Sequence, residues 1–357
     1  MKFQMRLPRV LLSELVGRDV AILGAGREGQ AAWRQLHALA PDQSVTVYSE
    51  SGFDDVAQPA AGRDQLISGP LDGAQLARHE VMIRSPGISP YREPLVAARA
   101  AGVASTTGTN LWMAENPRAR TLCITGTKGK STTSALLAHL LKAAGARVEL
   151  AGNIGRPLLD CDSQDADWWV VELSSYQICD LVESPWHATV LNLSDEHLDW
   201  HGSAQRYRRD KLRLLSLAPE GRRLVNAADP ALIRETRGIS GLEFFNGPQN
   251  IHVKDDGLRD GEHVLPGLKH LPGAHNLANL AAALTILDAI GLRPDKLARS
   301  LESFRGLPHR LSVVGRLGDV RFVDDSLSTT PVATLAALRA LQGAPVTLLL
   351  GGLDRGL

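Results

Sequence analysis

Residues 122–133 read LCITGTKGKSTT, an apolar strand that leads into a loop of glycine, lysine and hydroxyl-bearing residues. In a loop of this kind the backbone N–H groups cradle phosphates, Lys130 reaches the terminal phosphates, and Ser131 can bind Mg²⁺. The strict Walker spacing asks for glycine at position 124, where Ile124 stands, so the loop is a shortened form. The stretch predicts an ATP-binding loop, with a plain surface turn as the alternative. Its members are Gly126, Thr127, Lys128, Gly129, Lys130, Ser131 and Thr132.

Short apolar runs rich in Val, Ile and Leu alternate with helical stretches on both sides of this loop. The predicted strands are Val20–Leu23, Val45–Tyr48, Val81–Ile83, Leu122–Thr125, Trp169–Glu172, Ala188–Leu193, Leu224–Asn226, Phe322–Asp324 and Val346–Leu350. The predicted helices include Gln30–Leu39, Ala135–Ala144, Ala204–Ser216, Pro294–Phe304 and Pro331–Leu341. Continuous apolar strands that alternate with helices indicate an α/β fold with parallel sheets covered on both faces.

A length of 357 residues indicates two or three domains. Polar, proline-containing segments at 114–120 and 305–310 precede new strands, and we place the junctions there. The predicted domains are 1–116, 117–306 and 307–357. The third holds two or three strands and one helix. Its last strand ends at Gly351-Gly352, a turn that normally feeds another helix, so the C-terminal domain is predicted to be incomplete.

Charge and cysteine content exclude several classes of function. Lys plus Arg equals Asp plus Glu at 39 each, so no global field favours nucleic acid or a membrane surface. No apolar run approaches the roughly 18–20 residues of a membrane span, and the N-terminus lacks the features of a signal peptide. Three cysteines without CxxC spacing argue against a metal or disulfide framework. These features predict a cytoplasmic protein.

Another glycine loop, the first along the chain, follows the strand Val20–Leu23. Gly24, Gly26 and Gly29 form a GxGxxG pattern that opens a helix, a geometry that offers backbone N–H groups to a phosphate. NAD binding requires an acidic residue about 20 residues further on, and Glu50 comes late for that role. A pyrophosphate such as that of UDP is the favoured ligand, with NAD and a purely structural turn as alternatives. The loop after the strand Val81–Ile83, with sequence SPGIS, faces the same edge.

Candidate ligands follow other strands. Glu172 ends an apolar strand, where a lone carboxylate is costly unless it is paired or bound to a metal. Glu196 and His197 follow the run Ala188–Leu193. Lys211 lies in a helix among several arginines, and the charge pattern alone predicts an ordinary solvated lysine.

Together these segments resemble the Mur ligase family, the ATP-dependent amino-acid ligases of peptidoglycan synthesis. The resemblance runs from the first glycine loop to the last residue. It rests on GTKGKSTT at 126–133, GNIG at 152–155, VELSSYQ at 171–177, LNLSDEHLDWHG at 191–202, RDKLRLL at 209–215, PGAHNLANLAAAL at 272–284, PHRL at 308–311, DDSLSTTP at 324–331 and GGLDRG at 351–356.

The resemblance implies three domains: a Rossmann-like module for the UDP-sugar, a central P-loop ATPase, and a C-terminal Rossmann-like module for the amino acid. It implies catalytic roles for Lys130, His197 and Lys211, and two Mg²⁺ ions held by Ser131, Glu172, His197 and Lys211. A free ammonium cannot ligate a metal, so Lys211 is expected as its carbamate. Further nucleotide contacts are expected from Asn276, Asn279, Arg310 and Asp325. The expected substrate contacts are Gly24, Gly26, Arg27, Ser85, Gly87, Asn153, Ser174, His197, Thr329 and Arg355.

Within the family, the N-terminal domain and the segment SPGISPYREPLVAARAAGV resemble the enzymes that add glutamate to UDP-N-acetylmuramoyl-L-alanine. The usual D-glutamate enzyme carries a lysine where Leu327 stands here. Together with the segments 107–112 and 352–356, this difference makes the sequence more similar to the enzymes that add L-glutamate and are paired with a separate epimerase. L-glutamate is favoured and D-glutamate is next.

The expected reaction passes through an acyl phosphate and contributes to cell-wall synthesis, cell shape and cell division. Two alternatives stay open. One is a nucleotide-binding module without ligase activity, because the last domain is predicted to be incomplete. The other is a nicotinamide-dependent oxidoreductase that uses the first loop, which leaves the loop at 126–132 unexplained.

Overall fold

The computed structural model describes residues 8–53, 63–161, 165–255, 257–261, 263–268, 270–271, 273–293, 297–328, 331–341 and 343–352. The chain divides into two compact units. The first unit comprises 1–125, 149–188 and 195–219, and the second comprises 126–148, 189–194 and 220–357. The domain junctions predicted near 116 and 306 follow a different division and stay predictions.

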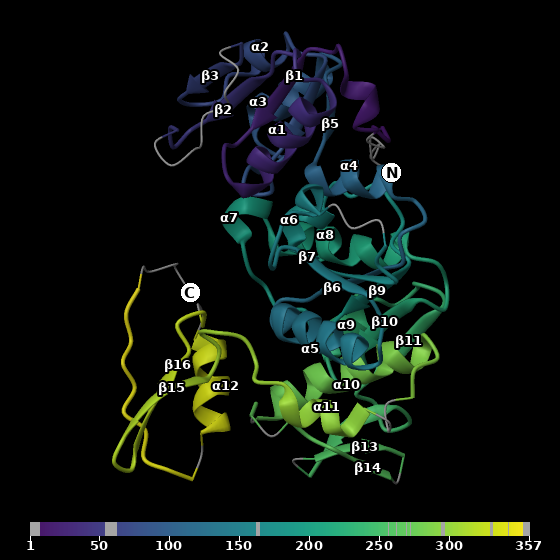
Figure 1. The fold of residues 1–357 in the computed structure, drawn as a ribbon, viewed down its shortest axis with the longest axis vertical. Coiled ribbons are helices and arrows are strands. Elements are labelled where there is room, and N and C mark those ends of the chain that lie inside the picture. Colours follow the sequence, from purple (N-terminus) through teal and green to yellow (C-terminus); the bar gives the residue numbers. More distant parts are fainter. Residues whose placement is uncertain are drawn as a thin grey trace. The chain divides into compact units, whose positions relative to one another are not determined.

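The first unit begins with a five-stranded sheet of order β3-β2-β1-β4-β5, in which every neighbouring pair is parallel (Figure 1). Its strands are β1 Val20–Leu23, β2 Thr46–Ser49, β3 Gln65–Ser68, β4 Val81–Arg84 and β5 Ala104–Thr106. The central strands β1 and β4 are buried at every position, as expected for a parallel sheet with both faces covered. Leu23, Met82 and Leu95 belong to one of the cores beside this sheet.

A second sheet has six strands in the order β11-β10-β9-β6-β8-β7. Its strands are β6 Thr121–Thr125, β7 Val148–Gly152, β8 Trp168–Glu172, β9 His187–Val190, β10 Arg223–Asn226 and β11 Leu242–Phe245. The pairs β6–β8 and β10–β11 are parallel. The fold class predicted from the sequence is therefore confirmed: an α/β protein with parallel sheets.

The helices occupy the segments between these strands. They are η1 Ser13–Leu15, α1 Arg27–Leu39, α2 Gly73–Leu76, α3 Glu93–Ala100, α4 Gly108–Glu115, α5 Lys130–Ala143, η2 Leu158–Asp160, α6 Ser175–Ile178, α7 Leu198–His201, α8 Ala204–Leu217, α9 Pro230–Glu235, α10 Ala274–Ala289, α11 Ala298–Ser303 and α12 Pro331–Ala340. Several begin at a side-chain cap, and α6 has a full capping box made by Ser174 and Gln177. None of the described helices combines the length and the apolar character that crossing a membrane requires.

Two smaller antiparallel sheets were not predicted as sheets, although one of their strands contains the predicted strand Phe322–Asp324. One contains β12 Ile251–Lys254, β13 Gly257–Asp260 and β14 His263–Leu265. The other pairs β15 Ser312–Leu317 with β16 Val320–Asp324, drawn in yellow-green beside α12 in Figure 1. Apart from Phe322–Asp324, these strands carry polar residues and tight turns in place of the apolar runs that marked the parallel strands.

Two strand predictions differ from the structure. The strand predicted over Ala188–Leu193 ends at Val190, because the following residues turn to make hydrogen bonds with the phosphate loop. The strand predicted over Val346–Leu350 is wrong: this segment has no strand pairing within the described residues, and Leu349 and Leu350 are largely exposed. Apolar composition alone does not make a strand without a hydrogen-bonded neighbour.

Candidate active site

The phosphate loop has the backbone geometry of an anion cradle. It follows β6, and α5 begins at Lys130 with Gly129 as its N-cap in the left-handed conformation, at φ +83°. A Cβ added at Gly129 would lie 2.3 Å from the Asn279 side-chain oxygen, so only glycine fits there. The N-terminal end of α5 therefore faces the loop, where a phosphate is favoured.

Side chains of the loop and of the segment after β9 hold the cradle in place. Asn192 accepts from the backbone N–H of Lys128 at 2.8 Å and donates to the Lys128 carbonyl at 3.0 Å. The Thr127 hydroxyl donates to the Ser194 carbonyl at 3.0 Å. The Lys130 ammonium donates to the carbonyls of Gly126 and Thr127 at 3.0 and 3.1 Å. The loop is thus formed in advance, with its lysine folded over it.

A cavity of about 410 Å³ lies beside this loop, entirely within the second unit. Predicted nucleotide ligands from distant segments share its lining, and apolar side chains such as Phe245 and Leu271 complete it. Burial lowers the pKa of His275, another lining residue, which favours its neutral form. The predicted nucleotide ligands in the lining are Lys128, Gly129, Thr132, Asn276, Asn279, Arg310 and Asp325.

The third predicted domain contributes two of these residues. Arg310 lies with its Nη2 3.4 Å from the Ser131 hydroxyl, and its Nε has no hydrogen-bond partner among the described residues. Asp325 accepts from the backbone N–H of Leu311 at 3.0 Å and from the Ser328 hydroxyl. An unpartnered buried donor on Arg310 suits an anionic ligand, whereas Asp325 already orders its own loop. Thr329 and Arg355 lie outside the described residues.

Glu172 lies at the end of β8 in the first unit and is 1% exposed. Its Oε1 accepts from the Asn153 side-chain amide at 2.7 Å, whereas Oε2 has no hydrogen-bond partner in the described part of the chain. A buried carboxylate oxygen without a partner is costly unless a cation meets it. Glu172 and Asn153, two residues predicted for metal and substrate, are therefore in direct contact.

Lys211 corrects the interpretation drawn from the charge pattern alone. It is not a solvated lysine, because the residue is only 2% exposed. Its Nζ lies 3.5 Å from the Thr125 hydroxyl and 5.1 Å from the centroid of the Tyr207 ring. The arginines of α8 are at least partly exposed, while the helix turns Lys211 inward at a position that the charge pattern could not distinguish.

His197 is the N-cap of α7 and adopts the left-handed conformation, at φ +56°. Its ring contacts the Tyr176 ring edge-on at 4.9 Å between centroids, and Tyr176 stacks on Trp200 at 4.2 Å. Left-handed backbone at a non-glycine residue is uncommon outside functional or turn positions. Glu172, His197 and Lys211 all belong to the first unit, whereas Ser131 belongs to the second, and their joint metal site stays a prediction.

No cluster of three or more His, Cys, Asp and Glu side chains suited to a metal occurs among the described residues. The ligand set predicted here mixes a hydroxyl, a carboxylate, an imidazole and a carbamate. Because Ser131 and Lys211 are not His, Cys, Asp or Glu, the absence of such a cluster does not test the predicted ligand set.

A second cavity, of about 480 Å³, lies in the first unit at the carboxyl edge of the five-stranded sheet. The structure brings there most of the residues predicted to bind the UDP-sugar. They are Gly24, Gly26, Arg27, Ser85, Gly87, Asn153 and Ser174. Gly29 is needed beneath the loop, since a Cβ there would lie 1.8 Å from the Gly24 carbonyl oxygen. Glu50 lines the cavity but pairs with both terminal nitrogens of Arg92 at 2.7 Å, which weakens its proposed role as a ribose ligand for NAD.

Glu28 is a lining residue that the sequence did not single out. Burial raises the pKa of its carboxyl to about 7, and the nearby Arg27 opposes that shift. The Gln177 side-chain amide donates to its Oε1 at 3.3 Å. The sequence shows that Glu28 lies within the GxGxxG pattern. The inward orientation of its side chain depends on packing against Gly108 and Gln177, which come from other segments.

A strand, a shortened glycine loop and a helix, with a cavity beside them, define an α/β protein of the P-loop nucleotide-binding class. Comparisons with known proteins narrow this class. Residues 124–287 match the model of the Mur ligase middle domain. The chain is 45% identical to the UDP-N-acetylmuramoyl-L-alanine–L-glutamate ligase of Xanthomonas axonopodis pv. citri, an alignment that covers 97% of this chain and 76% of that protein. A ligase of the same name from Micromonospora sp. is 44% identical, with 97% and 78% covered.

Solved structures share the fold at lower identity. The MurF ligase of Thermotoga maritima in complex with ADP superposes with a TM-score of 0.56 at 18% identity, covering 96% of this chain and 76% of that one. The UDP-N-acetylmuramoylalanyl-D-glutamyl-2,6-diaminopimelate–D-alanyl-D-alanyl ligase of Acinetobacter baumannii gives a TM-score of 0.57 at 16% identity, covering 95% of this chain and 78% of that one. The chain belongs to the Mur ligase family, so the family and the ligase class predicted from its motifs are confirmed.

Proposed function

We propose that this protein uses ATP to join glutamate to the carboxylate of UDP-N-acetylmuramoyl-L-alanine in peptidoglycan synthesis. The observation that carries the proposal is the pair of cavities. One lies beside the phosphate loop, and the other is lined by most of the residues predicted for the UDP-sugar. The names of the relatives at 44–45% identity support the same substrates.

The reaction proposed has two steps. An oxygen of the alanyl carboxylate attacks the γ-phosphorus of ATP, and the bond from this phosphorus to the β,γ-bridging oxygen breaks. ADP departs, and the product of this step is an acyl phosphate. The amine nitrogen of glutamate then attacks the acyl carbon, loses a proton, and phosphate leaves. Because carboxylate and phosphate repel each other, the protein must supply positive charge and orientation.

Lys130 is proposed as the group that stabilises the transferred phosphoryl group. Its ammonium lies within the loop, where it can exchange its carbonyl partners for phosphate oxygens. Arg310, whose Nε has no partner within the described chain and whose Nη2 lies 3.4 Å from the Ser131 hydroxyl, is proposed to add positive charge beside the loop. Asn276 and Asn279 are proposed to hold the adenine side.

Magnesium is proposed as the cofactor, held by Ser131, Glu172, His197 and a carbamate of Lys211. The buried Glu172 oxygen without a partner among the described groups supports a cation there. Bound Mg²⁺ neutralises phosphate charge and orients the phosphates. The burial of Lys211 supports the carbamate, because the side chain lies in the interior, where a carbamate can ligate a metal and a free ammonium cannot.

L-glutamate is the proposed amino acid. Leu327 stands where the D-glutamate enzymes carry a lysine, and the relatives are named as L-glutamate ligases. An epimerase that acts on the product, the cytoplasmic location, the three domain boundaries and the roles of Thr329 and Arg355 remain predictions. The oxidoreductase alternative is not favoured, because it has no use for the phosphate loop.

The test supplies the protein with ATP, Mg²⁺ and UDP-N-acetylmuramoyl-L-alanine, and adds L- or D-glutamate in separate reactions. We expect phosphate release and a product one glutamate heavier with the L enantiomer. UDP-N-acetylglucosamine, which lacks the carboxylate, serves as the control and should release no phosphate. Phosphate release that is independent of the carboxylate acceptor would contradict the proposal, and a product formed only with D-glutamate would reverse the enantiomer.

A further inference from the structure

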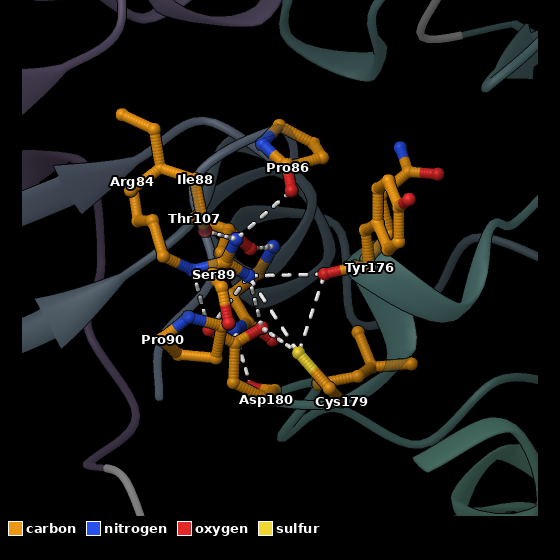
Figure 2. A network of polar contacts seen from close by, with 12 residues as sticks. Arg84, Pro86, Ile88, Ser89, Pro90, Thr107, Tyr176, Cys179 and Asp180 are labelled. Carbon is orange, nitrogen blue, oxygen red and sulfur yellow. Dashed lines mark hydrogen bonds and ion pairs between the residues drawn. The ribbon is translucent and has the colours of Figure 1, made fainter. Parts of the chain in front are cut away.

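Arg84 is the last residue of β4, and its side chain has no exposed surface. A buried guanidinium is stable only when it is paired with an acid and its five N–H donors are satisfied. Arg84 meets both conditions through groups from two separate segments, the loop that follows β4 and helix α6 with the residues after it. Figure 2 shows this guanidinium at the centre of the network.

On one side Arg84 binds the segment that contains α6. Its Nε donates to Oδ2 of Asp180 at 3.0 Å, and Nη2 donates to both carboxylate oxygens at 2.9 Å. Nη2 also donates to the Tyr176 carbonyl at 3.0 Å. Asp180 is itself held in place, because the Asn110 side chain donates to its carbonyl at 2.9 Å.

On the other side Arg84 binds the loop Ser85–Ile88. Its Nη1 donates to the carbonyls of Ser85, Pro86 and Ile88 at 3.1, 3.3 and 2.7 Å. The remaining carbonyl of the loop, that of Gly87, accepts from Nε1 of Trp200 at 3.1 Å. Side chains thus hold all four carbonyls of this loop.

The loop and the first turn of α6 are two walls of the 480 Å³ cavity. Ser85 and Gly87 line it from the loop, and Tyr176 and Gln177 line it from α6. The N–H of Gly87 makes no hydrogen bond within the described chain. Arg84 is absent from the lining, and Asp180 neutralises its charge. Any influence of Arg84 on a ligand must therefore pass through the shape of these walls.

We propose that Arg84 is a positioning residue of the UDP-sugar site, which fixes the loop Ser85–Ile88 against the first turn of α6 before the ligand binds. The inference rests on the proposed function, since that function names the ligand. A preformed site spares the ligand the entropy of ordering the loop. Lysine cannot replace Arg84, because one ammonium with three donors cannot reach Asp180, Tyr176 and three loop carbonyls together.

The first measurement is the steady-state kinetics of Arg84→Lys. We expect KM for UDP-N-acetylmuramoyl-L-alanine to rise roughly tenfold, while kcat and KM for ATP stay within about twofold. A merely structural role would instead lower activity toward both substrates together. An unchanged KM for the UDP-sugar, or a parallel loss on all three parameters, overturns the proposal.

The second measurement is hydrogen exchange of a peptide that covers 85–92, without any ligand. We expect faster exchange in Arg84→Lys than in the wild type. The matched control is Arg34→Lys, which alters another bidentate arginine–aspartate pair, with Asp160, and neither residue of this pair lines the 480 Å³ cavity. This control should leave both exchange and kinetics unchanged. Equal exchange of this peptide in Arg84→Lys and wild type overturns the proposal.

These two measurements separate the inference from the proposed function. If the wild type does not bind the UDP-sugar, the proposed function fails, while the ligand-free exchange still tests whether Arg84 fixes the loop. If Arg84→Lys does not fold, the double variant Arg84→Gln, Asp180→Asn takes its place, because it removes both buried charges together. The same rise in KM and faster exchange are then expected, and their absence overturns the proposal.

Discussion

The two glycine loops of this protein look alike in sequence but are supported in different ways. Each follows a parallel strand and opens a helix. The loop at 126–130 carries its own cations, Lys128 and Lys130, and binds its lysine ammonium through its own carbonyls. The loop at 24–29 carries Arg27 alone, and the cavity beside it takes its shape from Arg84 and Trp200.

The glycines themselves serve different purposes. Gly129 is required by its left-handed backbone and by the nearness of Asn279, which lines the 410 Å³ cavity. Gly29 is required because the carbonyl of Gly24 approaches α1 closely. A glycine pattern therefore identifies a strand–helix turn, whereas the surrounding donors decide which ligand the turn suits.

The largest expected effect comes from removing one cation, that of Lys130, from the loop at 126–130. Lys130→Ala should lower turnover at least about 10³-fold, because the transferred phosphoryl group loses its nearest preorganised charge. Phosphate release under saturating substrates measures this. Lys142→Ala, at the exposed far end of α5, is the matched control and should keep wild-type activity. Substantial ligase activity in the Lys130 variant would sink the assignment.

Glu28 offers a pH test that is confined to the first loop. Because burial raises the pKa of its carboxyl from 4.5 to about 7, the folded protein holds this proton more tightly than the unfolded chain. The resulting stabilisation is full below pH 4.5, declines between pH 4.5 and about 7, and is lost above that. Relative to Glu28→Gln, the wild type should lose about 3 kcal/mol of unfolding free energy between pH 4.5 and 8.

Urea denaturation of both proteins across this pH range measures the difference. Glu50→Gln is the control of opposite sign, because the hydrogen bonds from Arg92 lower the pKa of the Glu50 carboxyl. The contribution of Glu50 is present above its usual pKa and declines as the pH falls. Parallel stability curves for Glu28→Gln and the wild type would show that this carboxyl is not buried as described.

Alanine substitutions at Gly129 and Gly29 should have different effects, because the two glycines have different roles in their loops. Gly129→Ala should weaken ATP binding by roughly 10- to 100-fold, because strain of about 1–3 kcal/mol falls on the phosphate cradle. Gly29→Ala should lower the unfolding free energy by about 1–3 kcal/mol and spare ATP affinity. Calorimetry with ATP and urea denaturation measure the two effects. Loss of ATP binding in Gly29→Ala would contradict the separate roles.

The smallest expected effect is that of Trp200→Phe. The ring keeps its stacking on Tyr176 but loses the N–H that donates to the Gly87 carbonyl. One neutral hydrogen bond contributes about 0.5–1.5 kcal/mol, so binding of UDP-N-acetylmuramoyl-L-alanine should weaken by roughly two- to tenfold. Isothermal titration measures this, and stronger binding than in the wild type would refute the role of Trp200.

Much of the fold was predictable because parallel strands are continuous apolar runs. Val20–Leu23 was predicted with its observed bounds, and β4, β6 and β8 were each predicted to within one residue at either end. The short strand β5 and the antiparallel strands β12–β14 were missed, since polar or very short segments carry no such signal. Their existence depends on neighbours that are distant in sequence.

A motif predicts where a residue lies on the fold, as with Lys130 at the start of α5 and Glu172 at the end of β8, while their roles stay predictions. Residues whose surroundings come from distant segments could not be predicted in this way. Arg84 ends a strand, and nothing local reveals that Asp180 lies beside it, 96 positions away. Lys211 shows the same limit, since its burial follows from the packing of α8 and not from the charges around it.

The hydrogen bonds of Lys130 have a consequence for product release. Its ammonium already has two acceptors, the carbonyls of Gly126 and Thr127, before any nucleotide arrives. Nucleotide binding is therefore an exchange of hydrogen bonds, in which the new bonds to phosphate oxygens are partly offset by the broken bonds to these carbonyls. When the γ-phosphoryl group has left, the lysine can return to its own carbonyls. This return favours departure of ADP, and the loop regains its internal hydrogen bonds before the next catalytic cycle.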